Sequence, residues 1–285
     1  MNEIERIEVE LLLEAVFRKY GYDFREYTPA HARRRIRHRL AASGINTVSE
    51  LQGRVLREPD LFQQLLLDFS INVTEMFRDP PFYRKVREEV VPILRTYPFV
   101  RIWHAGCASG EEVYSMAILL REEGLYDRTQ IYATDFNEKI VRKAKEGIYD
   151  VERIKDYTAN YQKAGGKSSF ADYYMASYDN ALMDTSLKQN IVFSQHNLVT
   201  DGVFGEMQMI VCRNVLIYFE RELQDRVIGL WLESLCAGGL LCLGNREGLT
   251  RSVHADAFEV VSEKERIYRK RFNPGERLKS GEREG

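Results

Sequence analysis

The sequence has no stretch that approaches the roughly 18 consecutive apolar residues of a membrane-spanning helix, and its N-terminus lacks the apolar core of a signal peptide. Its four cysteines, Cys107, Cys212, Cys236 and Cys242, include no C-x-x-C pair and no histidines at metal-ligating spacing. With 41 basic and 43 acidic residues the formal net charge is only −2, so no general affinity for nucleic acid is expected. These absences predict a cytoplasmic protein that holds no metal ion and inserts into no membrane.

A strand, a tight turn and the start of a helix follow one another in the stretch 100–112, VRIWHAGCASGEE. Val100, Ile102 and Trp103 predict a buried strand, and the small residues that follow them predict the turn. Apolar residues then recur at i, i+3, i+4 and i+7 from Val113, which is the stripe of an amphipathic helix. Small turn residues let a ligand approach the backbone, and a helix N-terminus offers unpaired N–H groups. The stretch therefore predicts a ligand site.

The charges near this turn indicate which ligand the site would bind. Glu111 and Glu112 follow the turn directly and put negative charge where a phosphate would bind, so a pyrophosphate cofactor fits poorly. The next predicted strand, 130–135, ends in Asp135, where an acid can accept hydrogen bonds from a ribose. The glycine pattern is only G-x-x-x-G, and Asp135 lies 29 residues beyond Gly106 rather than about twenty. A nucleoside without pyrophosphate fits this pattern, and S-adenosylmethionine is the common one.

Up to about residue 75 the sequence shows helical periodicity and no alternating strand pattern, which predicts a small all-helical domain. One predicted helix, 31–40, has a narrow apolar face and carries the arginines Arg33, Arg34, Arg35, Arg37 and Arg39. These arginines form either a solvated face balanced by acids elsewhere or a docking surface for an acidic protein partner. No helix-turn-helix spacing accompanies them, so DNA binding is disfavoured.

The remaining sequence predicts the rest of a sheet. Apolar runs at 190–198 and 208–215 end in polar residues, as buried parallel strands do when they deliver side chains to a site. A helix at 221–235 leads through Gly238 and Gly239 to a strand at 240–243, and two further runs at 258–261 and 266–272 predict a closing hairpin. The interval at about 157–188 is rich in Tyr, Ser, Asp and Gly, which predicts a small antiparallel insertion.

These elements predict an α/β fold with a doubly wound, mostly parallel sheet, an antiparallel C-terminal hairpin, a small β insertion and a small all-helical N-terminal domain. The expected boundaries are 1–78 for the helical domain with its linker, 79–275 for the sheet domain, and 276–285 for a disordered tail.

Several short segments, taken in order, make the chain resemble the chemotaxis receptor methyltransferases, the CheR family. They follow a basic helical N-terminal domain and are Asn72–Arg78, Ala108–Ser115, Ala133–Asp135, His196–Leu198 and Cys212–Phe219. Each segment alone is a weak signal, but all of them in this order are specific. The resemblance covers nearly the whole chain and implies a class I methyltransferase-like fold.

The resemblance implies transfer of a methyl group from S-adenosylmethionine to glutamate side chains of receptor signalling helices, which yields methyl esters and S-adenosylhomocysteine. Asp135 would bind the ribose, and Arg78 and Tyr218 would lie at the reacting groups. The cofactor-binding residues that it implies are Asn72, Thr74, Arg78, Gly106, Glu112, Asp135, Asn197, Leu198, Arg213 and Asn214. The partner would be the cytoplasmic domain of a methyl-accepting chemoreceptor, with the enzyme acting as a monomer.

The implied chemistry agrees with the residues present. A glutamate acceptor is already ionised at neutral pH and needs no general base, and Arg78 could hold one carboxylate oxygen while the other attacks. Plainer roles are a salt bridge from Arg78 to Asp79, simple packing for Tyr218 and a helix cap for Asp135. His104 and His196 pair with no nucleophile in the sequence and are expected to pack or to form hydrogen bonds.

The chain departs from the family pattern after its last parallel strand, where Gly244-Asn245-Arg246-Glu247-Gly248 replaces a Gly-His-Ser-Glu type sequence. The predicted insertion corresponds to a subdomain that binds a receptor tether peptide in some relatives, but its sequence gives no basis for a tether here. Two other functions stay open at this point. A non-catalytic signalling module could bind S-adenosylmethionine or its demethylated product, whereas a nicotinamide oxidoreductase is disfavoured by the incomplete glycine motif.

Overall fold

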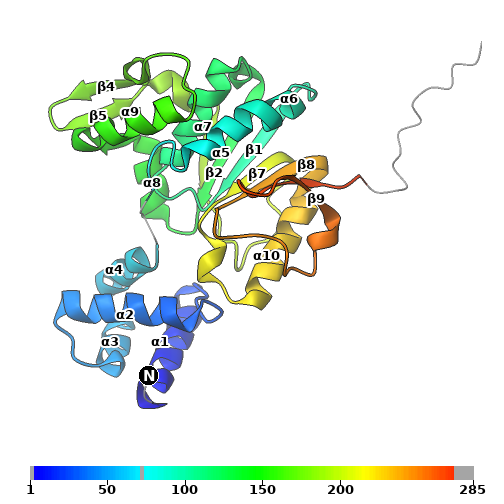
Figure 1. Cartoon of the computed structure of the whole chain (residues 1–285). Helices are drawn as coiled ribbons and strands as arrows, with labels where there is room; N and C mark the ends of the chain where they lie inside the picture. The colour runs from blue at the N-terminus through cyan, green and yellow to red at the C-terminus, as the bar shows by residue number, and fades with distance from the viewer. Residues whose placement is uncertain (1–2, 71–73, 273–285) are drawn as a thin grey trace, which may run out of the picture.

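The computed structural model describes residues 3–70 and 74–272, so the predictions for Asn72 and for the tail at 276–285 lie outside the described residues. The N-terminal part is helical, with α1 (Glu3–Tyr20), α2 (Pro29–Ser43), α3 (Val48–Val55) and α4 (Pro59–Phe69) grouped below the sheet in Figure 1. Both α2 and α4 begin with proline, whose missing N–H is tolerated in the first turn of a helix. Within the described ranges no helix is long and apolar enough to cross a membrane.

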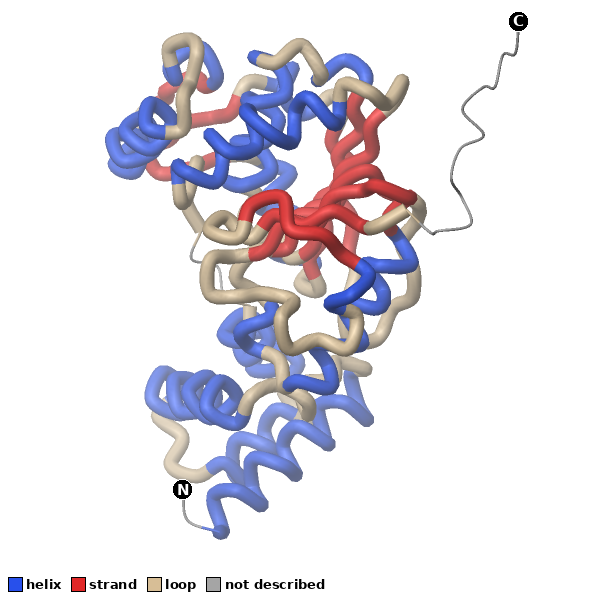
Figure 2. Tube along the Cα trace, turned by 45° about the vertical axis from the view of Figure 1, so that its right-hand side comes forward, coloured by secondary structure: helices blue, strands red, loops and turns tan. Residues whose placement is uncertain are grey.

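The central sheet has seven strands in the order β6-β2-β1-β7-β8-β10-β9. The first five strands of this order are parallel, and β10 runs antiparallel to both of its neighbours, which confirms the predicted fold class (Figures 1 and 2). The strands are β1 (Val100–Ala105), β2 (Thr129–Asp135), β6 (Ile191–Gln195), β7 (Met207–Cys212), β8 (Leu235–Leu243), β9 (Phe258–Ser262) and β10 (Ile267–Lys270).

Strand β8 begins earlier than the sequence pattern predicts. The two glycines lie inside the strand rather than before it, because Gly238 has a φ of 73° and the pairing of β7 with β8 shifts register between Met207 and Met209. A glycine can adopt this conformation without steric penalty and allows the ladder to continue past the irregularity.

Helices cover both faces of the sheet. They are α5 (Pro80–Lys85), which continues through a π-helical turn (Val86–Val90) into α6 (Val91–Leu94), then α7 (Glu111–Glu122), α8 (Glu138–Glu146) and α10 (Arg221–Ser234). Alternate residues of β7 enter two different cores: Met209 and Val211 pack with α7, whereas Ile210 and Cys212 pack with α10 and with the N-terminal helices. The helical domain and one face of the sheet therefore share a single hydrophobic core.

The predicted insertion is a three-stranded antiparallel sheet in the order β3-β5-β4, made of β3 (Ile148–Asp150), β4 (Tyr174–Ser177) and β5 (Asn180–Met183). Between β3 and β4 lies α9 (Ile154–Lys163), which packs beside α5 (Figure 1). The excursion from the main sheet thus begins at Ile148, directly after α8.

Candidate active site

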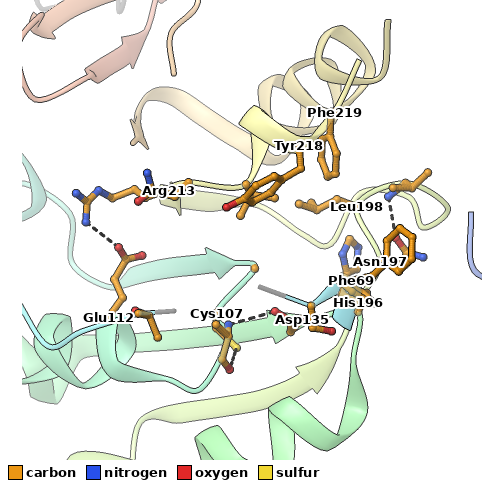
Figure 3. A pocket seen from close by; sticks show the side chains of 18 of the residues that line it. Phe69, Cys107, Glu112, Asp135, His196, Asn197, Leu198, Arg213, Tyr218 and Phe219 are labelled. Atoms are coloured by element: carbon orange, nitrogen blue, oxygen red, sulfur yellow. Dashed lines mark hydrogen bonds and ion pairs between the residues drawn. The ribbon is translucent and has the colours of Figure 1, made fainter. Parts of the chain in front are cut away.

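A cavity of about 940 Å³, including its open mouth, lies where β1, β2 and β7 end and the helical domain begins. Every predicted site residue within the described ranges lines it, namely Thr74, Arg78, Gly106, Glu112, Asp135, Asn197, Leu198, Arg213, Asn214 and Tyr218. Figure 3 shows Tyr218 and Leu198 on one side of this cavity and Cys107 and Asp135 on the other.

The turn after β1 brings the backbone to the cavity. The N–H groups of Gly106 and Cys107 both donate to the Thr134 carbonyl at 2.8 Å, which fixes the turn against β2. Gly106 has a φ of 78°, and a Cβ atom there would lie 2.7 Å from Cγ2 of Val215. The site therefore requires glycine at this position for reasons of conformation and of space.

Gly110, which the sequence analysis placed in the same small-residue turn, has a different role. It has a φ of 92° and is absent from the described residues that line the cavity. A Cβ atom there would lie 3.0 Å from the Cβ of Ala144, so its packing is against α8. Only Gly106 of the two glycines borders the ligand site.

Asp135 is buried at the end of β2, with only 8% of its surface exposed. Its carboxylate accepts hydrogen bonds from the N–H groups of Ala108 and Asn137, each at 3.1 Å. Burial raises the pKa of Asp135 to about 6, and these backbone hydrogen bonds act in the opposite direction. The cap of α8 is Asn137, whose side chain accepts from the N–H of Lys139, so Asp135 is not the cap residue itself.

A buried arginine organises the opposite wall. Arg213, whose side chain is 2% exposed, donates to Glu112 at 2.9 Å and to Asp79 at 2.7 Å, and its guanidinium lies 4.2 Å from the centroid of the Phe82 ring (Figure 3). Nδ1 of His104 lies 3.3 Å from the other oxygen of Glu112. Burial acts to raise the pKa of Glu112, but the hydrogen bond from His104 and the charge of Arg213 lower it overall. Glu112 therefore presents an ionised carboxylate to the cavity.

The two adjacent glutamates of α7 point in different directions. Glu111 is 1% exposed, and its carboxylate interacts with Ser109 at 2.6 Å and with Arg153 at 3.3 Å. It is absent from the described residues that line the cavity. The sequence places two negative charges after the turn, Glu111 and Glu112, but only Glu112 reaches the cavity.

Arg78 comes from the linker between the helical domain and the sheet domain. It lies between two residues with left-handed backbone conformations, Phe77 with a φ of 53° and Asp79 with a φ of 58°. The carboxylate of Asp79 binds Arg213. Such strained conformations cost about 1–3 kcal/mol each and are found at functional sites where surrounding contacts enforce them.

The loop that departs from the family pattern supports the site through Glu247. This side chain is 6% exposed and accepts hydrogen bonds from the N–H groups of Gly244 at 2.7 Å, Asn214 at 2.9 Å and Ile217 at 3.3 Å. It holds Asn214 at a φ of 64° and anchors the short helical turn that ends at Tyr218. No motif in the sequence predicts a role for Glu247; the one available signal is a carboxylate shortly after a buried strand.

The helical domain forms part of the cavity wall, a contribution that no sequence pattern predicted. Tyr27 and Phe69 line the cavity, and the N–H of Thr28 donates to the carbonyl of Tyr218 at 2.9 Å. The ring of His31, the third residue of α2, packs on Tyr218 with 4.6 Å between centroids. Burial raises the pKa of the Tyr218 hydroxyl, while nearby arginines act to lower it.

His104 and His196 both have structural contacts, as expected. His104 is fully buried beside Glu112, and Nε2 of His196 lies 3.1 Å from the carbonyl oxygen of Gly202. His196 also borders the cavity, where its ring packs edge-on against Trp103.

A mostly parallel sheet, a glycine turn after its first strand and an acid at the end of its second define an α/β nucleoside-binding fold of the methyltransferase type. Residues 72–267 match the family model described as "CheR methyltransferase, SAM binding domain", and residues 7–70 match "CheR methyltransferase, all-alpha domain". The chain belongs to the CheR methyltransferase family.

Curated relatives support this assignment over nearly the whole chain. The protein is 54% identical to "Putative methyltransferase Cher3" of Pseudomonas putida, over 93% of this chain and 97% of that protein. It is 27% identical to "Chemotaxis protein methyltransferase" of Listeria monocytogenes, over 81% of this chain and 86% of that protein. It is also 27% identical to "Chemotaxis protein methyltransferase 2" of Pseudomonas aeruginosa, over 87% of this chain and 89% of that protein.

The residues of the cavity fit S-adenosylmethionine, the cofactor of this family. Asp135 supplies a buried hydrogen-bond acceptor, Glu112 supplies an ionised carboxylate, and Gly106 leaves space against the backbone. Apolar side chains such as Phe136 and Leu198 complete the lining, as an adenine ring requires.

Proposed function

We propose that the protein transfers the methyl group of S-adenosylmethionine to glutamate side chains on the cytoplasmic signalling helices of chemoreceptors. The observation that carries this proposal is that Arg78 and Tyr218, from distant parts of the chain, line the same cavity as Asp135 and Glu112. The relatives named as chemotaxis protein methyltransferases support the choice of receptor. The product would be a glutamate methyl ester.

The cofactor, when bound, supplies an activated methyl group on a positively charged sulfur. Asp135 accepts hydrogen bonds from the ribose hydroxyls, because its carboxylate is buried at the end of β2 and borders the cavity. Glu112 is held ionised by His104 and Arg213 and interacts with the cationic part of the cofactor. Arg213 acts through Glu112 and positions it. Asn197, Leu198 and Asn214 surround the remainder of the cofactor, and Thr74 closes over it from the linker.

The acceptor needs orientation rather than activation. A glutamate side chain is ionised at neutral pH, so Arg78 can hold one of its oxygens while the other attacks the methyl carbon. The charges of Arg34, Arg35 and Arg78 act to lower the pKa of Tyr218, whereas burial and Glu247 act to raise it, so three cations lie near this tyrosine. A positive field favours an anionic acceptor.

The basic helix α2 therefore serves two purposes. Arg37 pairs with Glu5 and Arg39 pairs with Asp68, as expected for charges balanced within the domain. Arg34 and Arg35 instead act on Tyr218 at the cavity. We infer that this second pair contributes to binding an anionic acceptor.

The protein is further proposed to act as a monomer in the cytoplasm, beside the receptor signalling domain. Size-exclusion chromatography with light scattering measures the oligomeric state.

The test is methyl transfer from radiolabelled S-adenosylmethionine to a purified receptor cytoplasmic fragment, followed by mass spectrometry of the modified glutamates. We expect Arg78→Ala to lower kcat roughly 100-fold or more while cofactor binding is partly retained. Arg84→Ala is the control, because Arg84 is an exposed arginine six residues further along the chain. Unchanged labelling by Arg78→Ala would refute the role of Arg78. Calorimetric binding of the cofactor with no transfer to any receptor would instead favour a non-catalytic sensor.

A further inference from the structure

The insertion contacts the backbone of the linker immediately before Arg78. Nη2 of Arg153 donates to the carbonyl oxygen of Thr74 at 2.6 Å, and Nδ2 of Asn160 donates to the carbonyl oxygen of Met76 at 3.3 Å. Arg153 directly precedes α9, and Asn160 lies two turns further along the same helix. One helix of the insertion therefore binds two alternate carbonyl groups of the linker.

The next linker residue is held from the other side by the cofactor-binding domain. The N–H of Phe77 donates to Oγ of Ser115 on α7 at 2.8 Å, and the Ser115 hydroxyl donates to the Glu111 carbonyl at 2.6 Å. The fully buried ring of Phe77 packs against Tyr161 of α9, with 5.2 Å between centroids. The linker is thus enclosed between α7 and α9.

Arg153 also joins the insertion to the first residue of α7. Its Nη1 lies 3.3 Å from the carboxylate of Glu111, which is 1% exposed, and its guanidinium lies 5.1 Å from the centroid of the Tyr157 ring. Burial raises the pKa of Glu111. One side chain therefore connects three segments: the linker, the helix that carries Glu112, and the insertion.

These contacts explain how Arg78 keeps its backbone geometry. Phe77 and Asp79, its two neighbours, both have positive φ, a conformation that non-glycine residues adopt only when the surroundings enforce it. The hydrogen bonds from Arg153 and Asn160 end at residues four and two positions before Arg78, and they restrict the conformations that the linker backbone can adopt.

We propose that Arg153 and Asn160 are positioning residues, and that the insertion clamps the linker so that Arg78 is aligned with the methyl donor. The proposal rests on the function proposed above for Arg78. In this proposal the insertion affects methyl transfer through the linker, without itself binding a ligand.

The test compares Arg153→Ala and Asn160→Ala with Lys155→Ala, which removes an exposed cation from the same helix. We expect the two linker variants to lower kcat roughly 10- to 100-fold, as small displacements of reacting groups do, with a smaller change in cofactor affinity. Lys155→Ala should behave as the wild type. Arg153→Lys should restore part of the activity, because a lysine can still donate one hydrogen bond.

Hydrogen–deuterium exchange provides a readout that does not depend on the acceptor. Exchange in the peptide covering 74–79 should become faster in both linker variants, while exchange in β1 and β2 stays unchanged. Arg153→Ala removes the arginine that pairs with the buried Glu111, so this variant could fail to fold. Asn160→Ala removes only contacts with the linker.

If folded Asn160→Ala has the same kcat as the wild type and the same exchange at 74–79, the proposed clamp is refuted. The proposed function would not be affected by that result. A wild-type protein that methylates no receptor fragment would overturn the proposed function, and the exchange measurement would still decide whether the clamp exists.

Discussion

Protonation of Asp135 should weaken binding of S-adenosylmethionine as the pH falls through 6. Burial at the end of β2 raises the pKa of this carboxyl to about 6, and only the ionised form can accept hydrogen bonds from both ribose hydroxyls. The apparent affinity is the intrinsic affinity multiplied by the ionised fraction. That fraction is about one half at pH 6 and about one tenth at pH 5, so affinity at pH 5 should be roughly tenfold lower than at pH 8.

The raised pKa of Asp135 has the opposite effect on the stability of the cofactor-free protein, which should fall as the pH rises. A carboxyl whose pKa is raised on folding contributes stability below about pH 4, and that contribution is lost as the pH rises through 6. A shift of about two pKa units corresponds to roughly 3 kcal/mol. Ionised Asp135 therefore destabilises the empty protein at neutral pH, where it is needed for binding.

Isothermal titration calorimetry between pH 5 and pH 8 measures the affinity, and the Asp135→Asn variant is the control. The variant should bind weakly at every pH and show no inflection near 6. An inflection that persisted in this variant would have a cause other than Asp135. Glu112 stays ionised over this range because its pKa is lowered. Wild-type affinity that is constant from pH 8 to pH 5 would refute the argument.

Three further predictions concern the residues that support the site. Arg213→Met should lower the free energy of unfolding by roughly 1–3 kcal/mol in urea denaturation, since it leaves the partly buried carboxylates of Glu112 and Asp79 without their cation; unchanged stability would contradict this. Glu247→Gln should lower the free energy of unfolding by about 1–3 kcal/mol and also reduce kcat, because an amide cannot accept from all three backbone N–H groups. Loss of stability without loss of kcat would argue against a role of Glu247 in positioning the site. Gly106→Ala should lower both the cofactor affinity measured by calorimetry and the free energy of unfolding. The control is Gly21→Ala, at a φ of 77° with no neighbouring atom within 4 Å, which should cost only the backbone strain of about 1–2 kcal/mol. Equal effects of the two substitutions would refute the steric argument.

The sequence was sufficient to predict the sheet and the strand ends that carry the site. Buried strands appear as apolar runs, and parallel strands place the residues that follow them at one edge of the sheet. For this reason the strand pattern predicts Gly106 and Asp135 at a common site, and both line the cavity together with Asn214, which the family resemblance implied. The family segments added the linker residues Thr74 and Arg78, which no strand pattern marks.

Tertiary packing decided the direction of individual side chains. Neighbouring glutamates of one helix have the same local signal, yet Glu112 enters the cavity while Glu111 is bound by Arg153 from the insertion. The packing of His31 on Tyr218, and the hydrogen bonds of Glu247 to the turn before Tyr218, likewise depend on segments that are distant in sequence.

The order of residues along this chain determined which elements form and which of their ends carry polar groups, because periodicity and burial are properties of local sequence. The folded structure alone decided which charges are paired, which carboxylate is exposed to the cofactor and what holds Arg78 in place. Those outcomes depend on distances of a few ångströms between segments brought together by a shared core, and no local pattern encodes them.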